Sequence, residues 1–141
     1  MTAAIVPFLP EHIPAALKLW SESPGVRLND TDTLAGLARF LDRNPGLSLA
    51  VVDEGQLVGT LLCGHDGRRG YLQHMAVAEA YRRLGLGRQL VEGCLEALRE
   101  IDIHKCHVFV VRDNPFAGLF WERLGWIVRD DVHIYSGSNE R

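Results

Sequence analysis

The sequence has few of the features that mark secreted, membrane-spanning or metal-binding chains. Its three cysteines, Cys63, Cys94 and Cys106, are odd in number and far apart, which does not suit a disulfide framework. No run of about 18 apolar residues occurs, and the first residues lack a basic region followed by a long apolar run. We therefore expect free thiols within apolar stretches, a cytoplasmic location and no membrane partner.

Neither sign of charge dominates the chain. The formal net charge is -3, so binding to a nucleic acid would need a local basic patch. The only dense basic clusters are Arg68-Arg69 and Arg82-Arg83, with Arg88 close behind the second. These clusters are too short to follow a duplex but sufficient for one polyphosphate ligand. No nucleic-acid partner is expected.

The length of the chain and the positions of its glycine and proline residues between the predicted elements indicate one domain over residues 1–141. Hydrophobic periodicity predicts alternating strands and helices, and the resulting order is strand, two helices, three strands, helix, strand, helix, strand. The predicted segments are a strand at 5–9, a helix from 10 to about 23, a helix capped by Thr31 or Asp32 and ending at 44–46, strands at 47–52, 57–63 and 71–77, a helix from 85, a strand at 107–111, a helix opened by 113–115 and closed at 124–125, and a strand at 126–135. This order predicts an α/β fold of the α+β type, with a mixed sheet covered by helices.

The junction between the strand ending at Val77 and the helix after Gly85 is the best candidate for a binding site. Glycines let the backbone approach a ligand, and the first amides of a helix have no internal acceptors and can bind phosphate oxygens. The alternative is that Gly85 and Gly87 only permit a tight turn while the arginines are solvated. A Walker loop is excluded because Arg88 follows Gly87, and the dinucleotide fingerprint would need glycine at Leu90.

Arg82, Gly85 and Gly87 fill the pattern Arg/Gln-x-x-Gly-x-Gly/Ala, and this junction resembles that of the GCN5-related N-acetyltransferase (GNAT) family. The resemblance extends over nearly the whole chain, through Val58-Gly59 and Asp113-Asn114 to residues 120–126. It implies the GNAT-like acyl-CoA N-acyltransferase fold. It also implies direct transfer of an acetyl group from acetyl-CoA to a primary amine of a small molecule or protein.

The resemblance also implies which residues bind acetyl-CoA. The loop amides would hold the pyrophosphate, the backbone of the preceding strand would pair with the pantetheine arm, and the asparagine that opens the last helix would touch the cosubstrate while also capping the helix. The implied residues are Met75, Ala76, Val77, Arg82, Arg83, Leu84, Gly85, Leu86, Gly87, Arg88 and Asn114.

The candidate catalytic residues are Tyr71, His74 and Trp121. The family often uses a carboxylate on the strand before the loop and a tyrosine in the last helix, but these positions correspond here to Tyr71 and Trp121. Period-two alternation, unless a bulge shifts it, predicts that His74 faces away from Tyr71 and Gln73. Water-mediated proton transfer is therefore expected, with His74 as a hydrogen-bonded core residue, and the alternative is that His74 serves as the base. The departure at Trp121 leaves open a non-catalytic acyl-CoA sensor or interaction module.

By the same resemblance, the acceptor site would lie between the first two helices. Trp20 would form its wall and Asp30 would bind the amine, with Glu22 and Asp32 as further candidates and a capping role as the alternative. No metal site is expected, because neighbouring residues among His104, Cys106 and His107 diverge along a strand. The resemblance is compatible with a homodimer.

Overall fold

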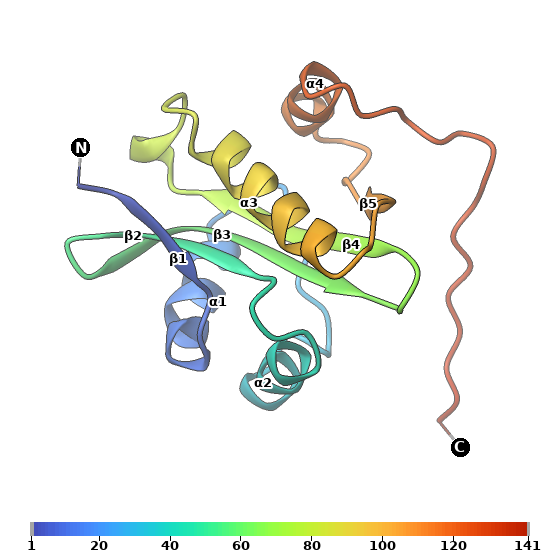
Figure 1. Cartoon of the computed structure of the whole chain (residues 1–141), viewed down its shortest axis with the longest axis horizontal. Coiled ribbons are helices and arrows are strands. Elements are labelled where there is room, and N and C mark those ends of the chain that lie inside the picture. The colour runs from blue at the N-terminus through green and yellow to red at the C-terminus, as the bar shows by residue number, and fades with distance from the viewer. Residues whose placement is uncertain (1, 141) are drawn as a thin grey trace.

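The computed structural model describes residues 2–140, and within them one mixed sheet is flanked by helices (Figure 1). The elements follow in chain order, with two short 3₁₀ helices labelled η: β1 (Ala4–Pro7), η1 (Pro10–His12), α1 (Ile13–Ser21), α2 (Leu34–Arg43), β2 (Leu49–Asp53), β3 (Gln56–His65), β4 (Gly70–Val77), η2 (Glu79–Tyr81), α3 (Leu86–Glu100), β5 (Cys106–Val108) and α4 (Pro115–Arg123). The predicted fold class is confirmed.

The sheet follows the order β1-β2-β3-β4-β5 over the described residues. Strands β1 to β4 form an antiparallel meander, whereas β5 runs parallel to β4 after the crossover through α3. Figure 1 shows α3 on one face of the sheet and α1 and α2 on the other.

Each face has its own hydrophobic core. On the α3 face, Leu61, Leu72 and Leu90 are fully buried in one cluster. On the other face, α1 and α2 bury a second cluster that includes Phe8, Trp20 and Leu62. The alternation of apolar residues along β3 supplies both clusters, because successive side chains of a strand point to opposite faces.

A β-bulge interrupts the pairing of β4 with β3. The register passes from Thr60↔Ala76 to Leu62↔Gln73, so β4 contains one residue more than β3 between these pairs. His74 lies in this stretch with a φ of 52°. The predicted alternation is consequently wrong at His74, which shares its face with Gln73, whereas Leu72 and Met75 belong to the α3 face.

The hydroxyl of Thr60 supports the bulge from the neighbouring strand. It accepts a hydrogen bond from Trp20 Nε1 at 2.7 Å and donates to the carbonyl oxygen of His74 at 2.9 Å. Thr60 is fully buried, and Trp20 is 1% exposed. One side chain thus fixes the position of α1 relative to the distorted part of β4.

Three predictions about element boundaries are corrected by the structure. Thr33, not Thr31 or Asp32, caps α2, and its Oγ1 accepts from Gly36 N at 2.9 Å. Asp32 makes other hydrogen bonds, to His74 and to the Asn29 amide. The predicted strand at 107–111 is realised as the shorter β5, Cys106–Val108.

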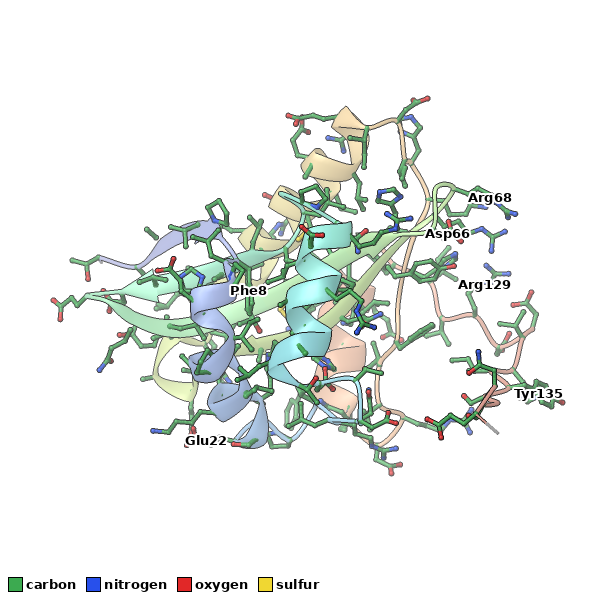
Figure 2. All side chains as sticks on the ribbon, turned by 90° about the horizontal axis from the view of Figure 1, so that it is seen from below. Phe8, Glu22, Asp66, Arg68, Arg129 and Tyr135 are labelled. Carbon is green, nitrogen blue, oxygen red and sulfur yellow. The ribbon has the colours of Figure 1, made fainter. Side chains whose placement is uncertain are left out.

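The third correction concerns the predicted last strand at 126–135, because no strand follows α4 within residues 2–140. This segment runs away from the sheet, and Figure 2 shows Tyr135 projecting from it at the edge of the molecule. Ile127, Ile134 and Tyr135 are at least 70% exposed. Alternation of apolar residues does not by itself supply a backbone partner.

We predict that Thr60→Val lowers the free energy of unfolding by about 1–3 kcal/mol, because it leaves the buried Trp20 N–H without an acceptor at nearly unchanged volume. Denaturant unfolding of Thr60→Val, Trp20→Phe and the double variant would test this. The two losses should be less than additive, since each removes the same hydrogen bond. A Thr60→Val variant as stable as wild type would contradict the prediction.

Candidate functional site

The loop from Arg82 to Arg88 joins β4 to the N-terminus of α3. Its turn depends on left-handed backbone at Arg83 (φ 65°) and Gly85 (φ 80°), and glycine adopts this conformation without strain. Gly85 is the N-cap of α3 and offers no side-chain acceptor to the first amides of the helix. Those amides are therefore available to an anion, which the helix dipole also favours.

Two contacts fasten this loop to the sheet. The Arg82 Nε donates to the carbonyl oxygen of Val77 at 2.9 Å. Tyr81, at the end of η2, donates its hydroxyl to Asp53 on β2, and this hydrogen bond raises the pKa of Tyr81. The start of the loop is thus held against the ends of β2 and β4.

Gly87 marks the point where α3, β4 and α4 meet. A Cβ atom at Gly87 would lie 3.2 Å from the ring of Phe120 on α4 and 4.0 Å from Met75 Cε on β4. The absence of a side chain lets the first turn of α3 approach both elements. The predicted cosubstrate residues on the loop and on β4 are therefore neighbours in space.

Beyond this point the edge of β4 toward β5 is open. The parallel pairing runs from Gly70↔Cys106 to Leu72↔Val108, whereas β4 continues to Val77. Among the described residues no strand pairs with Met75, Ala76 and Val77 on that side. Backbone groups at an open strand edge can pair with an extended ligand.

The bulge brings His74 together with Asp32, from the segment before α2. His74 Nε2 lies 2.9 Å from Asp32 Oδ1, and the two side chains are 12% and 5% exposed. The His74 ring also contacts Trp20 edge-on, with ring centroids 4.7 Å apart. An imidazole held in this way by a carboxylate is typical of a proton acceptor whose tautomer and orientation are fixed.

The same contacts revise the predicted acceptor site. Trp20 is buried and its indole N–H is bonded to Thr60, so it is a core residue and not an open wall. Asp32 is also engaged through its other oxygen, which accepts from Asn29 N at 3.0 Å. Asp30 is exposed and does not line the cavity that opens between α2 and the sheet beside Asp32, which is described below. Its predicted role in binding the amine stays a prediction.

The other two catalytic candidates lie elsewhere. Tyr71 is paired with β5, and its ring lies near His107 and Phe109, at centroid distances of 5.8 and 6.3 Å. Trp121 is 6% exposed and packs beside Trp126 at 4.7 Å, within the core under α3. The structure therefore brings His74, but neither Tyr71 nor Trp121, to the Asp32 carboxylate.

Asn114 caps α4, as predicted, and its Oδ1 accepts from Ala117 N at 3.3 Å. Its side-chain amide lies against Gly25, where a methyl group would be too close. The segment between α1 and α2 thus touches the start of α4. The predicted contact of Asn114 with the cosubstrate stays a prediction.

A cavity of about 370 Å³ opens beside Asp32, between α2 and the sheet. Its lining comes from the segment before α2, from α2 and its C-cap residue, and from β3 and β4: Thr31, Asp32, Gly36, Leu37, Arg39, Phe40, Arg43, Asn44, Leu62 and Gln73. Sequence reasoning missed Arg39 and Arg43. The available signal was their spacing of four residues, which places both on one side of a helix.

Neither a cluster of metal ligands nor a membrane-spanning helix is found in residues 2–140. No group of three or more potential metal-binding side chains gathers anywhere in these residues. Over the same residues, no helix is long and apolar enough to cross a membrane.

Comparison with known proteins identifies relatives of this chain. An acetyltransferase of Pectobacterium atrosepticum is 27% identical over 128 residues, covering 90% of this chain and 89% of the relative. N-alpha-acetyltransferase 30 of Schizosaccharomyces pombe is 26% identical over 92 residues, covering 62% of this chain and 61% of the relative. The crystal structure of PaiA N-acetyltransferase from Thermoplasma acidophilum in complex with coenzyme A superposes with a TM-score of 0.82 at 17% identity, over 92% of each chain.

The family model described as "Acetyltransferase (GNAT) family" matches residues 13–126, a span that runs from the start of α1 past the end of α4 and includes His74, the Arg82–Arg88 loop and Asn114. Because this match covers well over half of the chain and agrees with the observed fold, the protein belongs to the GNAT acetyltransferase family.

Proposed function

We propose that this protein transfers the acetyl group of acetyl-CoA directly to a primary amine, with His74 accepting the proton of the amine. The observation that carries the proposal is the His74–Asp32 pair at the bulge of β4, close to the open strand edge. The name of the fission-yeast relative, an N-alpha-acetyltransferase, supports an amine as the acceptor. The domain that performs this reaction spans residues 1–141.

The cosubstrate would bind on the α3 side. The amides at the start of α3 and the arginines of the Arg82–Arg88 loop would hold its pyrophosphate, because both present hydrogen-bond donors and positive charge. The edge of β4 from Met75 to Val77, which β5 does not pair, would hold the pantetheine arm. Asn114, at the start of α4, would touch the cosubstrate, and the thioester would then reach the gap between β4 and β5.

In the chemical step, the neutral amine attacks the thioester carbonyl carbon. The C–N bond forms, the C–S bond breaks, and the thiolate of coenzyme A leaves. His74 takes the proton from the amine nitrogen, while Asp32 keeps the imidazole in one orientation and stabilises its charged form. The thiolate is protonated through water, because the indole of Trp121 is a hydrogen-bond donor and not an acid near neutral pH.

The cysteines support direct transfer over an acetyl-enzyme. Burial raises the pKa of the Cys106 thiol to about 12, so little thiolate exists near neutral pH. A hydrogen bond with Cys63 and burial raise the pKa of Cys94 as well. Cys63 itself is fully buried.

The proposal replaces the water-mediated step expected from the sequence. That expectation rested on His74 facing away from Gln73, and the bulge turns it to the same face. Tyr71 lies beside His107 of β5 and Phe109, which follows that strand, and is assigned no proton transfer. Release of free thiol from acetyl-CoA, measured across a panel of primary amines, tests the function, and the absence of amine-dependent release would overturn it.

For the cosubstrate loop, we predict that Gly87→Asp weakens acetyl-CoA binding at least tenfold more than Gly87→Ala does, a difference of about 1.4 kcal/mol. Both variants place a Cβ beside Phe120, but only aspartate adds a negative charge where the pyrophosphate would bind. Titration calorimetry on the folded variants measures the two affinities. Equal acetyl-CoA affinities of the two variants would show that the pyrophosphate does not bind at this loop.

For the base, we predict that His74→Gln lowers kcat/KM by about a hundredfold, at the lower end of what general bases contribute. Glutamine retains a donor for Asp32, so the variant removes mainly the proton acceptor. His104→Gln is the matched control, because His104 makes a similar 2.8 Å contact with Asp102 but is 65% exposed. It should retain wild-type activity.

The pH profile separates His74 from water. With two acceptors of different pKa, the rise of kcat/KM should include an ionisation that stays at the same pH for both and is missing in His74→Gln. If water accepts the proton, the whole profile moves with the acceptor. If the pH dependence of kcat/KM follows only the pKa of the acceptor amine and is unchanged in His74→Gln, His74 does not accept the proton.

For Trp121, we predict that Trp121→Phe keeps more than a tenth of the wild-type turnover, because its buried indole shapes the core beside α4 and donates no proton. A tenfold loss corresponds to about 1.4 kcal/mol in the barrier. Steady-state kinetics, with thermal unfolding as a check of the fold, measure the effect. A thousandfold loss with intact acetyl-CoA affinity would assign the indole N–H a direct role.

A further inference from the structure

The cavity beside Asp32 carries positive charge along one side. Arg39 and Arg43 both line it from α2, four residues apart, and both are exposed. Neither takes part in any ion pair or side-chain hydrogen bond found among residues 2–140. Like charges at this spacing repel each other on a helix, so an anion between them would relieve an unfavourable arrangement.

The middle of the cavity is apolar. Leu37 and Leu62 are buried at 4% and 2% exposure, and Phe40 is half-buried beside them. These side chains can cover an aliphatic or aromatic segment of a ligand but offer it no hydrogen bonds. Among the polar lining residues, Thr31 and Asp32 precede α2, whereas Arg39 and Arg43 lie in its second half.

The end near the N-terminus of α2 adjoins the proposed base. Asp32 lines the cavity and lies 2.9 Å from His74 Nε2, and Gln73 precedes His74 on the same face. An amine at this end would lie beside Asp32, the carboxylate that holds the imidazole of the proposed base. The arginines follow along α2, where the rise of about 1.5 Å per residue puts Arg39 about 7.5 Å and Arg43 about 13.5 Å beyond Leu34.

From this arrangement, and resting on the proposed acetyl transfer, we propose that the acceptor is an elongated molecule with a primary amine at one end and an anionic group, carboxylate or phosphate, at the other. The amine lies at the end of the cavity lined by Asp32 and Gln73, the apolar segment at Leu37, Phe40 and Leu62, and the anion at Arg39 and Arg43. A diamine of the same length would place a cation beside two unpaired guanidinium groups, and the charges oppose its binding.

The experiment compares amines that share a six-carbon chain and differ only at the far end. Thiol release from acetyl-CoA gives kcat/KM for hexylamine, 1,6-diaminohexane, 6-aminohexanoate and 6-aminohexyl phosphate. We expect wild-type protein to prefer at least one of the two anionic acceptors over hexylamine by tenfold or more, and to use the diamine least. The ratio between the two anionic acceptors distinguishes a carboxylate site from a phosphate site.

The variants connect this preference to the arginines. In the double variant Arg39→Gln/Arg43→Gln, the ratio of kcat/KM for the preferred anionic acceptor to that for hexylamine should fall close to one. The fall should come mainly from a higher KM for the anionic acceptor, while kcat/KM for hexylamine changes less than threefold. Arg99→Gln is the matched control, because it removes the same charge from the opposite face of the sheet and should leave the preference intact.

The failures of the two proposals are distinguishable. If hexylamine is acetylated as well as both anionic acceptors, or if the double arginine variant retains the preference, the proposed acceptor class is overturned while acetyl transfer stands. If the folded protein, with acetyl-CoA bound, acetylates no amine of the panel, amine acetylation itself fails and the acceptor class fails with it.

Discussion

The hydroxyl of Thr60 connects the parts of the molecule on which the proposed chemistry depends. It accepts a hydrogen bond from the indole N–H of Trp20 on α1 and donates one to the carbonyl oxygen of His74, where β4 has its extra residue. Because the bulge puts Gln73 and His74 on the same face, the imidazole meets Asp32 instead of facing the α3 core. A regular β4 would bury His74 under α3 or displace the residues that follow it.

The pairing of β4 with β5 ends just before the bulge. Beyond Leu72 the two parallel strands no longer pair, and on that side β4 continues without a partner strand to Val77, before the chain turns into the Arg82–Arg88 loop. The open edge, the loop amides and the proposed base therefore lie along one stretch of chain. Gly87, pressed against Phe120 and Met75, keeps the first turn of α3 close to that edge.

The sequence predicts most of the fold because its elements are bounded by strong local signals. Gly85 before α3 and Gly125 after α4 adopt the left-handed backbone that glycine permits, and Asn114 caps α4 as its side chain suggests. The strand predicted at 126–135 is absent because pairing depends on a partner edge, which the alternation of one segment does not specify. The same holds for β5, where apolar residues extend to Val111 but pairing ends at Val108.

The candidate site was less predictable, since its key contacts join residues distant in sequence. Nothing local to His74 signals the bulge, which depends on Thr60 fourteen residues earlier, and nothing local to Asp32 signals a partner forty-two residues later. Asp32 was an equally good candidate for a cap or for a cation site. Only the packed structure shows both of its oxygens engaged.

The division of the sheet into two faces gives the proposed reaction its order in space. Acetyl-CoA would approach from the side of α3, where the loop amides and arginines attract its phosphates, while the acceptor would enter the cavity under α2. In the proposed reaction the two ligands would meet where the sheet opens, between β4 and β5. His74 lies on the face of α1 and α2, just beyond the last residue of β4 that pairs with β5, so in the proposed reaction it would take the proton of the amine as the thioester reaches this gap. In the proposed reaction, α1 and α2 on one face and α3 on the other would thus keep the two ligands apart until their reactive ends adjoin, and each ligand would be bound by its own arginines.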